Sequence, residues 1–171
     1  MKLSSKERIS LLNQYRILAK LYPDEEAHYQ ELVSILESGY EVFYSQIDQW
    51  LSDPMPEEEG RFVIDVLNMY RAIEDFKRSN ESDAVSTDFL SFFRGFDGNE
   101  EASYMSFAKF LILDQGKFAE QRNYFSKNDA LNSHAPMIGK YRRMVQRWQE
   151  TTAQWNLSER DVLAILGAAR S

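Results

Sequence analysis

Cysteine is absent from this chain of 171 residues, which also contains only two histidines, seven glycines and four prolines. Without a thiol, the sequence can form no disulfide, no thiol nucleophile and no zinc–thiolate or iron–sulfur site. The scarcity of histidine leaves only His28 and His134 as possible bases for a Ser-His-Asp mechanism. The missing cysteines also suit a reducing cytosol, so we expect a cytoplasmic protein.

Long hydrophobic runs are also missing. No stretch approaches the ~18 apolar residues that a membrane helix requires, and the longest one, at residues 107–113, is interrupted by Lys109. The N-terminal residues MKLSSKERISLL lack the apolar core of a signal peptide. We therefore expect a soluble protein with no membrane partner.

The net charge of −7 is unevenly distributed, with −8 on residues 1–85 and +1 on residues 86–171. An acidic half disfavours general nucleic-acid binding, because phosphate neutralisation needs clustered cations. The one basic cluster consists of Lys140, Arg142, Arg143 and Arg147, with Trp148 beside them. Lys140, Arg143 and Arg147 share one face of an expected helix. They could hold a phosphate or an acidic partner, but we favour pairing with the acidic half, within the chain or across a dimer.

Helical periodicity recurs along the sequence, whereas the alternation of a strand hardly appears. We predict an all-α fold, a compact bundle of six or seven helices in one domain over residues 1–171. Two subdomains of about residues 1–85 and 86–171, sharing one core, are the alternative. A long helix at about residues 56–79 should lie at the centre, because its apolar face is broad enough for two neighbours.

Local signals predict where several helices begin. Capping-box spacing at Ser4 and Glu7 precedes a helix of about residues 6–22, and the same spacing at Ser158 and Asp161 precedes the last helix. We expect Asp24 to cap the second helix. A short helix over residues 41–51 should then bury its apolar side chains, which are those of Val42, Phe43, Ile47 and Trp50.

The least ordinary segment is FLSFFRGFDGNEEASY at residues 89–104. Its acidic part superficially resembles a calcium loop. An EF-hand loop beginning at Asp97 would require glycine at position 102 and glutamate at position 108, and both are alanine here. We therefore interpret the segment as a turn that caps a helix.

A binding role for this turn is the alternative. Arg94, Phe96, Asp97 and Asn99 are its candidate contact residues. In this interpretation a small pocket places Arg94, Asp97 and the free N–H groups of residues 99–101 against an anion or a partner.

Catalytic and metal-binding signals are weak elsewhere. Glu25-x-x-His28 has the spacing of di-iron carboxylate bundles, but the second pair that such sites need is missing. Asp65 is the one acid expected to be partly buried, and the segment from Asn132 to Pro136 is expected to be a turn and cap. No nucleophile elbow, phosphate-binding loop or dinucleotide motif occurs. We predict no metal, no cofactor and no catalytic residue.

Several segments resemble the YfbU family of uncharacterised bacterial proteins. They are NQY at 13–15, LYP at 21–23, GY at 39–40, IDVLNMY at 64–70, GFD at 95–97, PM at 136–137, YRRM at 141–144 and LS at 157–158, with Glu101, Tyr104 and Trp148. The resemblance covers nearly the whole chain in order. It implies a helical, bacterial, cytosolic protein, and it brings no established activity or catalytic residue.

Three functions follow as hypotheses. The first is a non-enzymatic protein-interaction or regulatory module, working as a homodimer. The second is an enzyme or a small-ligand or anion binder that uses the turn at residues 94–99, with Asp65 or His134. The third and weakest is contact with nucleic acid through residues 140–147.

Overall fold

The computed structural model describes residues 2–170 and confirms the all-α class. Within that range no strand forms, and one isolated parallel bridge joins Phe96 to Asn132. Contacts divide the chain into two units, Met1–Pro54 and Met55–Ser171, which we call the N-terminal and C-terminal units. The single domain over residues 1–171, and its alternative of two subdomains of about residues 1–85 and 86–171, stay predictions.

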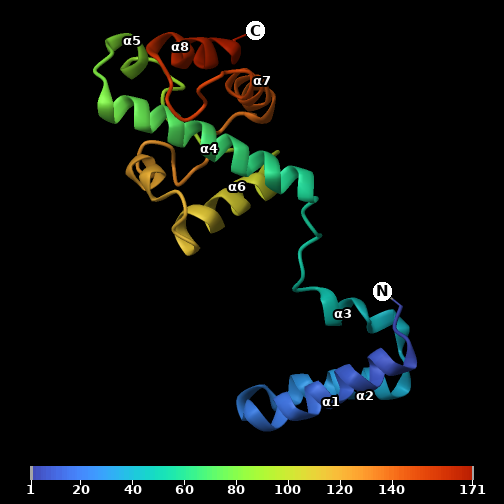
Figure 1. The fold of residues 1–171 in the computed structure, drawn as a ribbon. Helices are drawn as coiled ribbons and strands as arrows, with labels where there is room; N and C mark the ends of the chain where they lie inside the picture. The colour runs from blue at the N-terminus through green and yellow to red at the C-terminus, as the bar shows by residue number, and fades with distance from the viewer. Residues whose placement is uncertain (1, 171) are drawn as a thin grey trace. The chain divides into compact units, whose positions relative to one another are not determined.

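The N-terminal unit is built on a pair of helices, α1 (Ser5–Leu21) and α2 (Glu26–Ser38), that lie side by side (Figure 1). The capping box predicted at Ser4 and Glu7 is present. Asp24, however, does not cap α2. It lies inside a 3₁₀ turn, Pro23–Glu25, that separates the two helices, so α2 begins two residues later without a side-chain cap.

The prediction of one helix over residues 41–51 is wrong. This segment forms a 3₁₀ turn, Glu41–Phe43, and the single-turn helix α3, Ser45–Asp48. So short a segment does not sustain a helix unless packing supports it, and little support is present. Val42 and Trp50 are each 79% exposed, and Phe43 is 45% exposed.

The C-terminal unit is arranged around α4, Glu57–Ser79, as predicted for the central helix. Figure 1 shows α6 on one side of α4 and α7 with α8 on the other. Residues on α4 alternate between these neighbours at helical spacing, so the helix is apolar over more than one face. Its buried side chains are those of Val63, Val66, Leu67, Met69, Tyr70, Ala72, Ile73, Glu74 and Phe76.

The remaining elements complete the C-terminal unit. They are α5 (Asp83–Ser86), α6 (Ala102–Lys109), a π-helical turn (Phe110–Asp114), a 3₁₀ turn (Ala119–Tyr124), α7 (Ile138–Gln149) and α8 (Glu159–Ala168). The second predicted capping box, at Ser158 and Asp161, is present at the start of α8.

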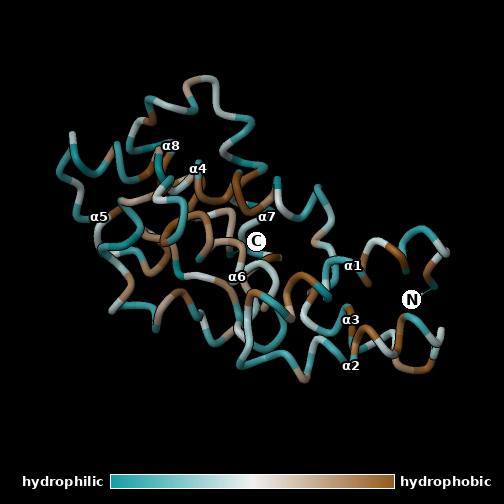
Figure 2. The backbone as a smooth tube through the Cα atoms, turned by 90° about the horizontal axis from the view of Figure 1, so that it is seen from below, coloured by the Kyte–Doolittle hydropathy of each residue, from teal (hydrophilic) through white to brown (hydrophobic). Residues whose placement is uncertain are grey.

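One hydrophobic core runs through this unit. Val85 on α5 and Val162 on α8 belong to it together with the buried face of α4. Figure 2 shows the alternation of hydrophobic and hydrophilic residues along the helices that produces this burial. Among residues 2–170, no helix combines the length and hydrophobicity needed to cross a bilayer.

Candidate functional site

The turn at residues 94–101 is fixed against a second segment, residues 128–134. Phe96 donates its backbone N–H to the carbonyl of Leu131 at 3.1 Å, and Ser133 donates to the carbonyl of Phe96 at 3.1 Å. Gly95 has a φ of +85°, and a Cβ there would lie 2.0 Å from the Leu131 carbonyl oxygen. Only glycine therefore permits this approach of the two backbones.

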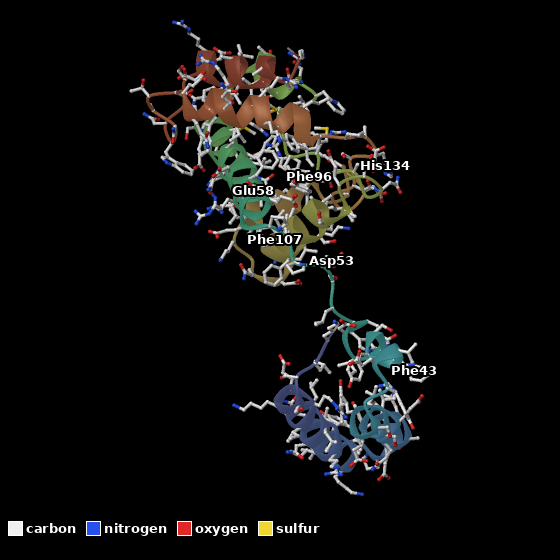
Figure 3. All side chains as sticks on the ribbon, turned by 90° about the vertical axis from the view of Figure 1, so that its right-hand side faces the viewer. Phe43, Asp53, Glu58, Phe96, Phe107 and His134 are labelled. Atoms are coloured by element: carbon white, nitrogen blue, oxygen red, sulfur yellow. The ribbon has the colours of Figure 1, made fainter. Side chains whose placement is uncertain are left out.

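Phe96 is an anchor of this turn and offers no exposed surface. Its side chain is fully buried, with ring centroids 5.6 Å from Phe93 and 5.5 Å from Tyr141. Figure 3 shows it inside the C-terminal unit, in contrast to the exposed Phe43. The predicted contact with a ligand or partner at Phe96 would thus require the core to open.

Glu101 holds the turn to the start of α7. This carboxylate is buried and accepts hydrogen bonds from the backbone N–H groups of Met137 at 2.7 Å, Ile138 at 2.8 Å and Asp97 at 3.0 Å. Helix α7 has no side-chain cap of its own at the N-cap residue. A carboxylate at the positive end of the helix dipole supplies that cap from 36 residues away in sequence.

Asp97 and Asn99 are used within the turn. The Asp97 carboxylate accepts the backbone N–H of Asn99 at 2.7 Å and that of Glu100 at 3.4 Å, and its backbone carbonyl accepts the N–H of Glu101 at 2.9 Å. The N–H groups expected to face an anion are therefore satisfied by Asp97 itself.

Tyr141 on α7 connects the turn to the core. Its hydroxyl accepts the backbone N–H of Arg94 and donates to the carbonyl of Gly95, both at 3.1 Å. Burial raises the pKa of Tyr141 well above the usual value for tyrosine, although the hydrogen bond from Arg94 opposes the shift. The side chain therefore stays protonated and keeps its donor role.

Arg94 is the one candidate in the turn whose side chain lines a cavity. Its guanidinium carbon lies 4.0 Å from the ring centroid of Phe89 and 4.5 Å from that of Phe92. No ion pair or side-chain hydrogen bond joins this guanidinium to another residue in the described range. We call the adjoining space, of about 130 Å³, the Arg94 cavity. Its other lining residues are Lys127, Asn128, Asp129, Asn132, Ser133 and His134.

An Asp–His pair and a serine meet at this cavity without forming a catalytic triad. His134 Nε2 lies 2.9 Å from Asp129 Oδ2, and both side chains are largely exposed. The Ser133 hydroxyl donates to the carbonyl of Ala135 at 2.7 Å instead of to the imidazole. A nucleophilic serine needs its base within hydrogen-bond reach, so this geometry activates no nucleophile.

The backbone on this side of the cavity is left-handed. Asp129, Ala130 and Leu131 have φ values of 44°, 53° and 69°. The left-handed conformation costs a residue other than glycine about 1–2 kcal/mol, so surrounding contacts must hold the segment. Asn128 provides two of them, because it donates to the carbonyl of Phe93 at 3.0 Å and accepts the N–H of Leu131 at 3.1 Å.

The basic residues of α7 do not converge on one site. Arg143 donates to the carbonyls of Ala168 at 3.1 Å and Ala169 at 2.8 Å, at the C-terminal end of α8. Arg147 lies 3.8 Å from Glu150 in an ion pair, and Lys140 Nζ lies 3.9 Å from the sulfur of Met137. All these contacts lie within the C-terminal unit.

Asp65 lines a polar groove of about 490 Å³ between α4 and α7. Burial raises the pKa of its carboxyl above the usual value, and the nearby Arg61 opposes the shift. The amide of Gln149 approaches it at 3.4 Å.

His28 lies far from these groups in sequence, is exposed, and touches the ring of Tyr29. Across residues 2–170, no three His, Asp or Glu side chains gather closely enough to hold a metal ion.

A match to the YfbU domain spans residues 1–168. The chain belongs to the YfbU domain family. It is 43% identical over 169 residues to the UPF0304 protein MJECS11 of Methanocaldococcus jannaschii, an alignment that covers 97% of this chain and 99% of that protein. This relative is archaeal, so the similarity does not show the bacterial source that the resemblance implies. The YfbU domain includes both units of the chain.

Sequence reasoning missed half of the Arg94 cavity. Residues 118–135 show no helical period, and the only feature predicted there is the turn and cap that begins at Asn132. Nothing in the sequence indicates that this segment pairs with a turn more than 30 residues earlier. The one available signal was the cluster of asparagine and aspartate at residues 128–132, which tolerate left-handed backbone better than most residues.

Proposed function

We propose that this YfbU chain is a non-enzymatic, cytoplasmic interaction module that forms a homodimer through its N-terminal unit. One observation carries the proposal. Of the fourteen large hydrophobic residues exposed in the described range, nine lie in this unit of 54 residues. We call them the N-terminal apolar set. They are Ile9, Ile17, Leu21, Tyr22, Tyr40, Val42, Phe43, Trp50 and Leu51.

The unit's own core is small. Its cluster of buried residues contains only Leu32, Ile35, Leu36 and Tyr44. A segment of about 50 residues buries too little surface to be more than marginally stable alone. Association that covers the N-terminal apolar set would supply the missing burial.

The exposed area suits an interface. The four aromatic side chains of the set are about half exposed or more, and burying what they expose would remove on the order of 450 Å² from water. This is about half of the ~800 Å² that each partner contributes to a standard interface. The five aliphatic side chains can supply much of the remainder.

Charge favours a second copy as the partner. Helix α1 carries four basic residues and one acid, whereas the segment from Pro23 to Ser38, which includes α2, carries five acids and no lysine or arginine. In a two-fold four-helix arrangement, each basic α1 lies beside its own acidic α2 and that of the partner. The same surface is then complementary to itself.

The oligomeric state tests the proposal. We expect light scattering after size-exclusion chromatography to give twice the chain mass, with dissociation on dilution. Ile17→Lys and Val42→Lys should each shift the protein to monomer, because each places a charge within the apolar set. Gln30→Lys, at an exposed polar position of α2, is the matched control and should leave the dimer intact.

A strict monomer at all concentrations would overturn the homodimer. So would a dimer that tolerates both lysine substitutions in the apolar set. If the wild-type chain is monomeric and instead retains a different protein from a cell lysate, the unit is an interaction module for another partner, and the self-association proposed here is wrong.

A further inference from the structure

We propose that the Arg94 cavity binds a phosphate or phosphate-ester group. The cavity lies in the C-terminal unit and is independent of the dimer proposed for the N-terminal unit. Two cations, Arg94 and Lys127, line it together with the imidazole of His134. Asp129 is the one carboxylate in the lining.

Arg94 is positioned before any ligand arrives. Its guanidinium lies against the rings of Phe89 and Phe92, and its backbone N–H is held by the hydroxyl of Tyr141. A guanidinium stacked in this way keeps its hydrogen-bond donors free at the edge of the plane. Since little side-chain freedom remains to be lost, binding an oxyanion costs less conformational entropy than at a free arginine.

Lys127 approaches from the other segment. Its ammonium lies 5.9 Å from the ring centroid of Phe92 and 5.5 Å from that of Tyr124. Arg94 and Lys127 therefore both lie near the ring of Phe92, and both side chains line the Arg94 cavity. In the described range no acid forms an ion pair with either of them.

Size and charge select the ligand. About 130 Å³ is the space of roughly four water molecules, which is far smaller than the ~300–1,000 Å³ sites of nucleotides and cofactors. A single phosphate group fits that space. Its charge of about −1.5 to −2 matches the two cations of the lining better than the single charge of a carboxylate does.

The strained backbone supports the assignment of a site here. The left-handed residues Asp129 to Leu131 are held by the side chain of Asn128, which accepts the N–H of Leu131, and by a backbone hydrogen bond from the N–H of Asn132 to the carbonyl of Asp129. Asn132 accepts the N–H groups of Gly98 at 3.0 Å and His134 at 3.1 Å. This bracing fixes the polar residues of the second segment opposite Arg94, which is how a preorganised anion site is built.

Titration with inorganic phosphate and with methyl phosphate, followed by ³¹P and amide NMR at low ionic strength, tests the inference. We expect saturable binding by about 20 mM, where a site of millimolar affinity is occupied. Equal binding of both probes indicates a site open to esters, whereas binding of inorganic phosphate alone restricts the site to the free ion. Acetate at the same concentration should bind more weakly.

Substitutions in the cavity lining should change the affinity for phosphate in opposite directions. Arg94→Gln should weaken phosphate binding about ten-fold or more, and Arg94→Lys should be intermediate, because it keeps the charge but loses the planar fork. Lys127→Gln should weaken binding a few-fold. Asp129→Asn should strengthen it a few-fold, because it removes the one repelling carboxylate. Arg160→Gln, which removes an exposed cation on α8 outside the cavity, should change nothing.

Three results would overturn the site. The first is the absence of chemical-shift changes at the lining residues with about 20 mM phosphate, a concentration that saturates millimolar binding. The second is an Asp129→Asn variant that loses binding. The third is an Arg94→Lys variant that retains a native amide spectrum and binds no differently from Arg160→Gln. Because Asp129→Asn is expected to gain affinity, damage to the fold cannot imitate the predicted result.

Discussion

The two units of this chain solve the problem of burial differently. The C-terminal unit encloses a continuous core around α4 and satisfies the polar groups of its central turn with buried Glu101 and Tyr141. The N-terminal unit has four residues in its buried cluster and leaves nine large hydrophobic side chains in water. By these criteria the C-terminal unit covers its own hydrophobic residues, whereas a partner would be needed to cover those of the N-terminal unit.

This difference separates two kinds of function. An apolar surface on a unit with a small core suits association, because burial there adds to the stability of the unit. A small cationic cavity braced by a rigid core suits a specific ligand, because its geometry does not depend on the occupant. We therefore assign the proposed dimer to one unit and the proposed phosphate site to the other.

Gly95→Ala should have the largest effect and should act on the C-terminal unit alone. The new Cβ meets the backbone of Leu131, which cannot move without breaking the contacts of the left-handed segment. We expect a loss of about 3 kcal/mol or more in the free energy of unfolding. Chemical denaturation followed by tryptophan fluorescence measures it. Gly167→Ala in α8, with nothing within 4 Å of its Cβ, is the control and should be neutral or slightly stabilising.

Matched core substitutions test whether the units unfold separately. Leu36→Ala and Leu67→Ala each remove a buried leucine, the first in the N-terminal and the second in the C-terminal unit. Each should cost about 3 kcal/mol. Hydrogen exchange should show that each loss is confined to its own unit. If either substitution weakened both units equally, the chain would unfold as one cooperative body and the comparison would fail.

Glu101→Ala tests the satisfied turn. It removes one carboxylate that accepts three backbone N–H groups and leaves all three without that partner. A loss of about 2–3 kcal/mol is expected, with increased exchange at the start of α7. The control is Glu100→Ala at the neighbouring exposed position, which should lie within about 0.5 kcal/mol of wild type. If Glu101→Ala and Glu100→Ala lowered the free energy of unfolding equally, the hydrogen bonds that Glu101 accepts would contribute no measurable stability.

Sequence reasoning predicted the parts of this fold that depend on local chemistry. The capping boxes at Ser4 and Ser158 and the central helix α4 follow from spacing within a few residues, and the structure confirms them. The prediction of one helix over residues 41–51 failed because only Ile47 of its apolar side chains packs on the core of the unit, whereas Val42, Phe43 and Trp50 stay exposed. Hydrophobic periodicity shows which side chains would form the apolar face of a helix. It does not show whether the folded chain provides a surface that covers this face.

The candidate site was only partly predictable for the same reason. The sequence offers Arg94 and, as an alternative to Asp65, His134 for one site, and both line this cavity. Lys127 carries no such signal and reaches the cavity through tertiary contacts. Likewise, the acid that caps α7 is Glu101, which lies in another element. Such long-range pairings depend on the packed chain, and no local pattern in a single sequence specifies them.

Gln121→Met should raise the stability of the C-terminal unit, because Gln121 is one of two side chains in the described part of that unit, with Tyr70, whose buried polar atoms lack a hydrogen-bond partner. The Gln121 side chain is 1% exposed, and neither its amide nitrogen nor its amide oxygen has a hydrogen-bond partner among residues 2–170. A methionine of similar length removes the two unpaired groups and keeps the packing. We expect a gain of about 1 kcal/mol in the free energy of unfolding. A clear loss instead would indicate that water or a ligand satisfies the amide.

Asp65→Asn should give the smallest change, and its pH dependence fixes the cause. Because burial raises the pKa of this carboxyl in the folded chain, the folded state binds its proton more tightly than the unfolded state. The ionised form is therefore unfavourable to folding at neutral pH, and this penalty disappears as the pH falls below the usual aspartate value. Asn removes the ionisation, so we expect a gain of a few tenths of a kcal/mol at pH 7, limited by solvent screening. The gain should vanish near pH 3, where the wild-type carboxyl is also neutral. A gain that persists unchanged at low pH would trace the effect to packing against Gln149 instead of to charge.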